Sequence, residues 1–423
     1  MKANRSKLTA LVLLIAAIAP SSFAQLVIPS DGSDGALVIT GTNVIDLSQA
    51  ITGTWSANNS AKAGQGIYDS NQWAVVFKYS SVTIASGAVV TFANHPSHAP
   101  VVWLVSGDVT INGDLGLDGQ SVYNNAPQLA EPGPGGFRGG AGTFTGGVYA
   151  SSGFGPGGGY YGNWGAGASY GGAGVVANNS GNIAPAETYG NPSLLPLIGG
   201  SGGGGYYYGT QGGGAGGGAI LIASAGTITI SGAVHANGGN EGYNRGAGGG
   251  SGGGIRLVAN ALAGSGTVQC LGANDQSYGG VGRVRVERVL NNNTIQVTPD
   301  PSVVPLQAGN TPLIWLPTNG PTATIVSVGT AAAPADPRAS FGTYGPDVTL
   351  PQTTNTAVVV QTVNAETASQ VLVRVTARAN AEFTETPATL VQTNSLNPLT
   401  LTWVANVPVN AGFSSLIARV IRP

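Results

Sequence analysis

The chain has 423 residues, a formal net charge of −2 at pH 7 and only 8% charged side chains, against about 25% in an average globular protein. This low content of charged residues excludes the clusters of lysine and arginine that nucleic acid binding needs. No nucleic acid partner is therefore expected. It also leaves few ionisable groups from which an active site could be built.

Residues 1–24 have the pattern of a secretory signal peptide. Lys2, Arg5 and Lys7 precede the apolar run Leu8–Ala19, and residues 22–24 (SFA) offer a cleavage site between small residues. The apolar run is too short to span a bilayer, and no other segment is long and apolar enough to cross one as a helix. We expect an exported protein, secreted or at the cell surface, with no membrane span.

Stretches of about twenty residues recur after an N-terminal cap region, residues 25–72, that holds short strand-like pieces at Ala36–Thr40 and Asn43–Leu47. The recurring stretches are Val75–Asn94, Val101–Gly119, Ile220–Gly238 and Ile255–Gly272. Each one alternates apolar and polar residues, with Gly, Asn or Ser between the runs. This pattern predicts a solenoid over residues 73–300, in which every turn buries its apolar face on the next.

The stretch Ile220–Gly238 shows how one turn would be built. Because side chains alternate between the two faces of a strand, one set would point to the same side: residues 220, 222, 228, 230, 234 and 236. The β-branched residues in this pattern favour half-buried strands. Gly226 and Gly232 fall at two corners, where we expect positive φ. Three short strands per turn would then form a three-sided parallel coil, and parallel crossovers are overwhelmingly right-handed.

Residues 131–218 form a glycine-rich insertion, and 34 of the chain's 69 glycines lie between residues 133 and 218. Because glycine loses the most backbone entropy on ordering, such a run is either disordered or held by close backbone packing, for example as polyproline-II segments. Aromatic residues stand between these glycines and in a second, shorter glycine run. The candidate ligand-binding residues are Tyr160, Tyr161, Trp164, Tyr206, Tyr207, Tyr208 and Tyr243. They either form a recognition surface on which sugar rings stack, or pack onto the glycines and hold the insertion in place.

The composition changes near Pro301, and residues 301–423 are rich in Val, Thr and Pro. Short alternating runs predict an antiparallel β-sandwich there. The predicted strands are Pro312–Leu316, Thr322–Val328, Thr356–Thr362, Ser369–Thr376, Thr389–Gln392, Leu399–Val404 and Ser415–Ile421. The predicted fold class is therefore all-β, a right-handed parallel β-helix with a glycine-rich insertion followed by an antiparallel sandwich.

Three segments carry a resemblance to a known class: GGGAGGGAILIASAGTITISGAVHANGG, GGGSGGGIRLVANALAGSGTVQC and GGVGRVRVE. They resemble glycine-rich exported bacterial proteins of the right-handed parallel β-helix (pectin-lyase-like) class, over roughly residues 73–300. The C-terminal part resembles an immunoglobulin-like module. The resemblance implies a secreted or surface protein, often an adhesin and sometimes a polysaccharide-cleaving enzyme, and it specifies the fold better than the activity.

Asp114 and Asp118, near one corner of the predicted coil, are the best catalytic candidates and the only weak calcium candidates. The interpretation that we favour for both is that of structural turn residues, and no other cofactor is expected. His95, His98 and His235 are interpreted as structural or surface residues, Cys270 as a buried apolar residue, and Arg283 with Arg285 as a solvated face.

We therefore expect a secreted or cell-surface structural or adhesion protein that binds a surface polysaccharide or another extracellular matrix polymer through its aromatic and glycine loops. One alternative is a polysaccharide lyase or glycoside hydrolase on the same scaffold. Another is an extracellular fibre or coat protein that self-associates through strand edges.

Overall fold

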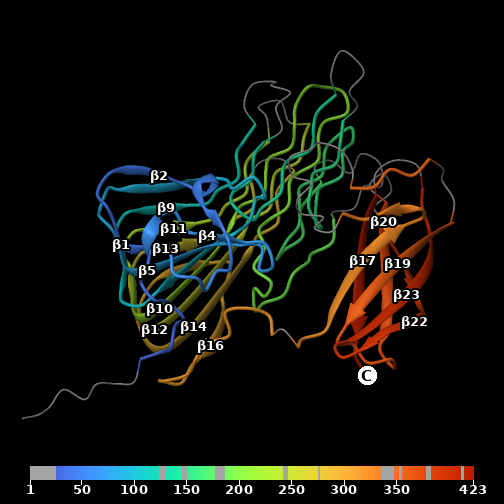
Figure 1. The fold of residues 1–423 in the computed structure, drawn as a ribbon. Coiled ribbons are helices and arrows are strands. Elements are labelled where there is room, and N and C mark those ends of the chain that lie inside the picture. Colours follow the sequence, from blue (N-terminus) through green and yellow to red (C-terminus); the bar gives the residue numbers. More distant parts are fainter. Residues whose placement is uncertain are drawn as a thin grey trace, which may run out of the picture.

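The computed structural model (Figure 1) describes residues 25–122, 130–143, 150–176, 186–241, 246–274, 277–317, 319–334, 347–351, 355–377, 383–410 and 414–423. In these ranges the chain is all-β, as the sequence predicts. It contains no α-helix there, and its helical turns are η1 (Leu47–Gln49) and η2 (Ser60–Lys62).

Two sheets of mainly parallel strands form the N-terminal three quarters of the molecule. The larger sheet has ten strands: β16 (Ser302–Pro305), β14 (Arg283–Asn293), β12 (Gly254–Gly264), β10 (Ala219–Ile230), β7 (Val101–Val105), β8 (Val109–Ile111), β5 (Ala74–Ile84), β4 (Ile67–Asp69), β3 (Ile51–Thr52) and β1 (Gly35–Ile39). Every pairing in it is parallel except β4 with β5.

The smaller sheet has six strands, all parallel: β15 (Gln296–Thr298), β13 (Thr267–Gln269), β11 (Ala233–His235), β9 (Asp114–Gly116), β6 (Val89–Ala93) and β2 (Thr42–Asp46). The chain alternates between the two sheets, so that each pass adds a strand to the larger sheet and then one to the smaller. The N-terminal residues 35–46 belong to both stacks, because β1 pairs with β5 and β2 pairs with β6.

One apolar core lies between the two sheets, and it contains the residues that the alternation assigned to the inside. Ile220, Ile222, Ile228, Ile230, Val234 and Ala236 all belong to it. Cys270 follows the next rung, one residue after the pair His235 and Gln269, and is fully buried as predicted. Burial raises the pKa of its thiol, which keeps the sulfur protonated and inert.

The three strands expected per turn are separate in one coil and partly merged in another. In Val101–Gly119 they are β7, β8 and β9, whereas in Ile220–Gly238 the first two form one strand, β10, with a register irregularity between Ser224 and Thr227. Gly226 and Gly232 do not have positive φ. They are needed for close approach instead, because a Cβ on Gly226 would lie 2.2 Å from an Asp108 carboxylate oxygen and one on Gly232 1.9 Å from the Gly113 carbonyl.

The outer face of the larger sheet is also covered. A second apolar cluster joins Val76, Val102 and Leu221 to Leu26 from the N-terminal segment and Ile314 from the segment after β16. The strand predicted at Pro312–Leu316 is therefore wrong, because this segment crosses the sheet without joining it. The expected domain boundary at residue 301 falls just before β16, which still pairs with β14.

The glycine-rich segments are ordered where the structure describes them, and we call them the glycine bundle: residues 117–122, 130–143, 150–176, 198–206, 211–218, 236–241, 246–254, 270–274 and 277–282. They run side by side out from one end of the sheets (Figure 1). Along residues 213–218 every third N–H donates to the same neighbouring segment: Gly213 and Gly216 to Gly140 and Phe137, Gly214 and Gly217 to Gly248 and Ser251, Ala215 and Gly218 to Gln120 and Leu117. A three-residue repeat with bonds radiating to three neighbours is the geometry of polyproline-II helices.

Glycine is required in this bundle by contact between backbones. A Cβ on Gly203 would lie 1.9 Å from the Gly248 carbonyl oxygen, and one on Gly213 would lie 2.0 Å from the Gly203 carbonyl oxygen. No side chain fits at these distances, so the described segments of the insertion form an ordered unit packed through its main chain.

The glycine packing gives a direct stability prediction. Replacing Gly203 by Ala forces two backbones apart and should lower the free energy of unfolding by about 1–3 kcal/mol, measured by urea denaturation. Gly41→Ala is the matched control, because nothing lies within 4 Å of its Cβ position and its φ is not in the left-handed region, so it should change stability by less than about 0.5 kcal/mol. Equal effects of the two substitutions would contradict this account.

Two antiparallel sheets share one apolar core in the C-terminal part. The first contains β18 (Ala331–Ala332), β17 (Thr322–Val328), β19 (Asn355–Val363), β23 (Leu399–Pro408) and β22 (Thr389–Leu396); the second contains β21 (Phe383–Pro387), β20 (Gln370–Ala377) and β24 (Ser414–Ile421). Val358 and Val360 of the first sheet pack with Val371 and Val373 of the second. Six predicted strands match observed ones, whereas β18 and β21 were not predicted.

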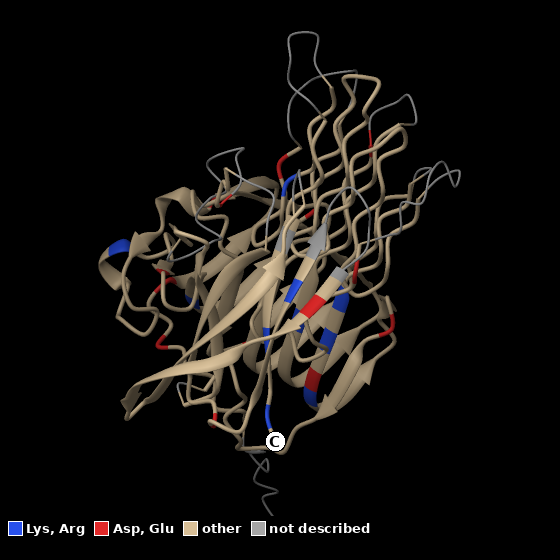
Figure 2. Cartoon of the chain, turned by 90° about the vertical axis from the view of Figure 1, so that its right-hand side faces the viewer, with Lys and Arg blue, Asp and Glu red and all other residues tan. Residues whose placement is uncertain are grey.

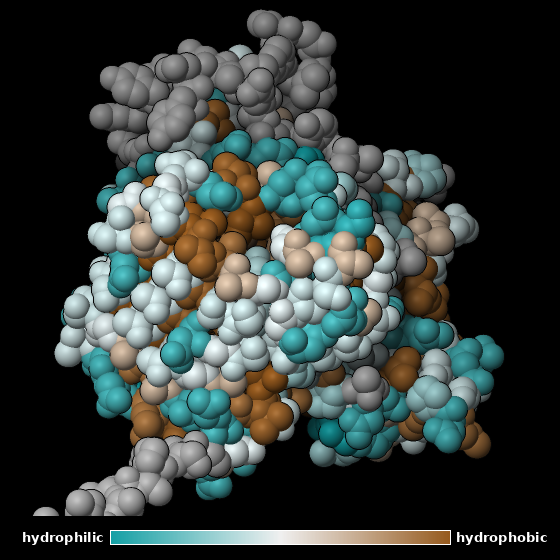
Figure 3. Space-filling model, turned by 60° about the vertical axis from the view of Figure 1, so that its left-hand side comes forward, coloured by the Kyte–Doolittle hydropathy of each residue, from teal (hydrophilic) through white to brown (hydrophobic). Residues whose placement is uncertain are grey.

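Charged residues are few along the described chain, as the blue and red segments of Figure 2 show. On the side seen in Figure 3, pale residues of intermediate hydropathy surround scattered apolar ones. Within the described ranges, no helix has the length and apolar character needed to cross a membrane.

Candidate functional site

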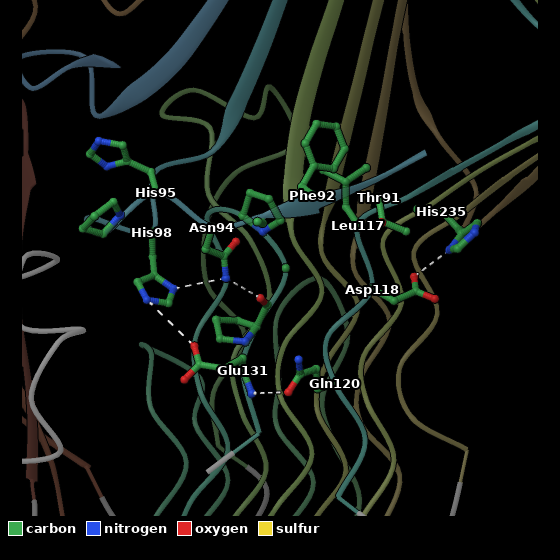
Figure 4. Close-up of a pocket in the computed structure, with 16 residues that line it drawn as sticks. Thr91, Phe92, Asn94, His95, His98, Leu117, Asp118, Gln120, Glu131 and His235 are labelled. Carbon is green, nitrogen blue, oxygen red and sulfur yellow. Dashed lines mark hydrogen bonds and ion pairs between the residues drawn. The ribbon is translucent and has the colours of Figure 1, made fainter. Parts of the chain in front are cut away.

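A cleft of about 470 Å³ opens where the glycine bundle meets the smaller sheet (Figure 4). Its walls are the end of β6 with the loop 94–98, the segment 116–120 that follows β9, the turn 131–134, and His235 at the end of β11. All three histidines of the chain line it, together with Asp118 and Glu131. In a chain with 8% charged residues, this is an unusual concentration of polar chemistry.

His235 is held on both ring nitrogens by the two predicted catalytic acids. Its Nε2 lies 2.7 Å from Asp114 Oδ1 and its Nδ1 lies 2.8 Å from Asp118 Oδ1. The register of β9 with β11 explains this, because Gly116 is the rung partner of His235. A Cβ on Gly116 would lie 2.8 Å from the ring, so only glycine leaves room for the imidazole between the two acids.

This arrangement determines the protonation of His235. Ionised carboxylates only accept hydrogen bonds, so this arrangement favours the charged imidazolium, which donates from both ring nitrogens. Burial lowers the pKa of His235, but the hydrogen bonds and charges of Asp118 and Asp114 outweigh burial and raise it above its ordinary value. With both nitrogens occupied, His235 cannot serve as a base or a metal ligand in this geometry.

The raised pKa of His235 makes part of the stability depend on pH. The folded chain holds a proton that the unfolded chain releases near pH 6.5, so this contribution is complete below that pH and disappears as pH rises through the raised pKa. The melting temperature of the native chain should therefore exceed that of His235→Gln most at pH 6, and the difference should shrink towards pH 9. A difference that stays constant over this range would rule out the charged pairing.

His95 lines the cleft with a neutral ring. Its Nδ1 accepts a hydrogen bond from the Ser97 backbone N–H at 3.1 Å, so the proton of the neutral ring is on Nε2. The ring stacks on Tyr68 with 4.1 Å between centroids, and burial lowers the pKa of His95, which keeps the ring neutral.

His98 adopts φ 51°, a left-handed conformation that costs a non-glycine residue of the order of 1 kcal/mol. Its carbonyl accepts from the Gly135 N–H, which ties the loop to the glycine bundle. Burial, with the charge of Arg138 and the neighbouring His95, lowers the pKa of His98 to about 4. The ring is neutral at pH 7, so its 3.9 Å approach to Glu131 is no ion pair there, whereas Arg138 pairs with Glu131 at 2.8 Å.

The lowered pKa of His98 predicts acid sensitivity. In the unfolded chain this histidine becomes protonated near pH 6.5, whereas in the folded chain it becomes protonated only near pH 4. The free energy of unfolding therefore falls as pH is lowered between these values. Compared with His98→Asn, which tolerates the same backbone conformation, the native chain should lose about 3 kcal/mol more in urea unfolding between pH 7 and pH 4. Parallel pH profiles for the two chains would contradict this assignment.

Asn94 leaves a hydrogen-bond acceptor without a partner. Its Nδ2 donates to the Pro132 carbonyl at 2.8 Å and approaches His98 Nδ1 at 3.5 Å. Its Oδ1 is buried and has no partner within the described residues. Within the described residues Asp118 uses only Oδ1, for His235 and the Asn237 N–H, so its Oδ2 has no partner there.

The calcium expectation for Asp114 and Asp118 finds no support in their geometry, because each commits an oxygen to the His235 imidazolium. No group of three or more His, Cys, Asp or Glu side chains placed to hold a metal occurs within the described residues.

The predicted aromatic residues fall into two sets. Tyr160 is buried within the glycine bundle, whereas Tyr207 is 40% and Tyr208 68% exposed. Tyr161, Trp164 and Tyr206 are half-buried, and Tyr243 lies outside the described residues.

The segments that carry these aromatics meet at one end of the bundle. The Tyr207 N–H donates to the Gly162 carbonyl, and the Gly165 N–H donates to the Gly246 carbonyl. A Cβ on Gly246 would lie 2.3 Å from the Tyr206 ring, so Tyr206 packs directly on that backbone. Tyr208 contacts Tyr206 and Tyr207 edge-on, with 6.2 and 5.1 Å between centroids. We call Tyr206, Tyr207 and Tyr208 the tyrosine cluster.

The cleft was not predicted from the sequence. His95 and His98 are distant in the chain from His235, and no pattern singled out Asn94 or Glu131. The interpretation of Arg283 and Arg285 as a solvated face is wrong: Arg283 donates to the Tyr189 carbonyl and lies over the Tyr170 ring, and Arg285 bonds Glu287 and Ser302.

Comparisons of this chain with protein-family models, with curated proteins and with solved structures found no significant match.

Proposed function

We propose that this chain is an exported, extracellular binding protein that attaches to a surface polysaccharide or another matrix polymer through the tyrosine cluster. The signal-peptide pattern of residues 1–24 supports export. The scarcity of charge supports a ligand recognised by stacking and neutral hydrogen bonds.

For the scaffold, we propose a right-handed parallel β-helix followed by an immunoglobulin-like β-sandwich. In-register parallel pairs, such as β10 with β12 and β11 with β13, support successive turns of one coil. The general handedness of parallel crossovers supports the right-handed form. The shared core of the two C-terminal antiparallel sheets supports the sandwich.

The observation that carries the binding proposal is the exposure of Tyr207 and Tyr208 on a backbone that is hydrogen-bonded to a neighbouring segment. Large apolar side chains on a packed backbone offer contact area at little cost in conformational entropy. Tyr206 fixes the cluster to the bundle, and the half-buried Tyr161 and Trp164 come from the adjoining segment. Sugar rings stack on aromatic faces of this kind.

The tyrosine cluster can be tested by substitution. Tyr207→Ala combined with Tyr208→Ala should reduce retention on immobilised polysaccharides at least tenfold, measured across acidic and neutral polymers, with an unchanged melting temperature. Tyr278→Ala is the matched control, because Tyr278 is 46% exposed on another segment of the same bundle. Retention that survives the double substitution, or falls equally in the control, would refute the cluster as the binding surface.

A second candidate, a polysaccharide lyase or glycoside hydrolase, is favoured by one observation: Asp118 and Glu131 line the same cleft. Glycosidases use two carboxyl groups across a scissile bond. The engagement of Asp118 with His235 and of Glu131 with Arg138 supports binding over catalysis. Incubation with the same polymers and an assay for new chain ends decides between them: cleavage that Glu131→Gln abolishes would make the chain an enzyme.

A further inference from the structure

We propose that the cleft is a second carbohydrate site, which takes one or two units of a neutral or amino sugar and not of a uronate. The inference shares with the proposed function only the class of ligand, since the cleft and the tyrosine cluster have no residue in common. A cleft of about 470 Å³ is within the size range of small-molecule sites.

The open hydrogen-bonding groups of the cleft suit hydroxyl groups. Asp118 Oδ2 accepts and has no partner in the part of the chain that the structure describes. Asn94 Oδ1 also has no partner there, but it is buried in the wall behind the cleft surface. His95 Nε2 carries a proton to donate. A sugar hydroxyl both donates and accepts, so it satisfies both kinds of group, whereas a buried acceptor left without a partner costs about 1–3 kcal/mol.

Apolar surface lies between these polar groups. Phe92, Leu117 and the rings of Pro96, Pro132 and Pro134 contribute to the walls. A pyranose ring has apolar C–H faces and a polar rim, so a cleft that mixes ring surfaces with separated acceptors and donors fits its shape and chemistry.

The charge of the cleft selects among sugars. Asp114 and Asp118 face one imidazolium, His235, so this group carries a net negative charge. Glu131 is neutralised by Arg138. Burial lowers the pKa of His95 and of His98, so neither adds positive charge near pH 7. Among the described residues of the cleft, every positive side chain faces an acidic partner. The remaining negative charge disfavours the carboxylate of a uronate, whereas neutral and amino sugars are accepted.

The walls of the cleft are held in place before any ligand arrives. Asn94 bonds the Pro132 carbonyl, and Gln120 Oε1 accepts from the Glu131 N–H at 3.3 Å. Figure 4 shows these contacts, with Asn94, His98 and Glu131 on one side and Asp118 and His235 on the other. Such preorganisation lowers the entropy that binding would otherwise lose.

The three histidines allow the site to be observed directly. Because the chain has no other histidine and all three line the cleft, the imidazole signals in an NMR spectrum of the untagged, ¹⁵N-histidine-labelled chain report on this cleft alone. The probes are tetrasaccharides of β-1,4-linked glucosamine, of its N-acetylated form and of galacturonic acid. The first two should shift the imidazole signals in a saturable way at millimolar or lower concentration, and the third should bind at least tenfold more weakly.

A substitution that adds a positive charge to the cleft tests its selectivity between charged and neutral sugars. Thr91 lines the cleft with an exposed side chain, so Thr91→Lys places a positive group there. It should weaken binding of the glucosamine tetrasaccharide at least tenfold and that of its acetylated form less. Thr83→Lys is the matched control, because Thr83 is also exposed on a strand of the stack but lies outside the cleft, and it should change neither affinity.

The outcomes separate this inference from the proposed function. Imidazole shifts that persist in the Tyr207→Ala, Tyr208→Ala chain support an independent cleft site, even if that chain also keeps its polymer retention and so refutes the tyrosine cluster. Unmoved imidazole signals with all three sugars, or tighter binding of the galacturonate than of the other two, would overturn the cleft site whatever the polymer assay gives.

Discussion

Contact between glycine backbones is the constraint on which the rest of this molecule depends. The bundle segments approach so closely that a single Cβ, as on Gly203 or Gly213, would collide with a neighbouring carbonyl. Their N–H and C=O groups then satisfy one another in a three-residue repeat. A stretch that would lose much entropy on ordering becomes rigid because its hydrogen bonds are internal and its packing is dense.

Both candidate sites depend on this rigid bundle. The tyrosine cluster is set on it, with the Tyr206 ring lying on the backbone at Gly246. The cleft forms where the bundle joins the smaller sheet. There the His98 carbonyl accepts a hydrogen bond from the Gly135 N–H, and the Asn94 side chain donates one to the Pro132 carbonyl. The polar and aromatic groups of both candidate sites are thus attached to a hydrogen-bonded backbone, which would lower the entropy that binding loses.

Much of the sheet structure could be predicted from the sequence, because the alternation of apolar and polar residues indicates which side chains face inward. Ile220, Val234 and Cys270 lie in the core for that reason. The order of the glycine bundle could not be predicted, since a run of glycines has no side-chain pattern to show which segments touch. Alignment of the coils could have paired Gly116 with His235 and so brought Asp114 and Asp118 to it. Asn94 and Glu131 meet only through packing of distant loops, and no local signal predicts that.

Hydrogen–deuterium exchange of the intact chain tests the central claim most directly. If glycine packing holds the molecule together, amides of residues 199–206 and 213–218 should exchange as slowly as those of the core strand β10, because their N–H groups are bonded and buried in the same way. Exchange of these amides within seconds, while β10 stays protected, would show that the bundle opens independently and would contradict the account.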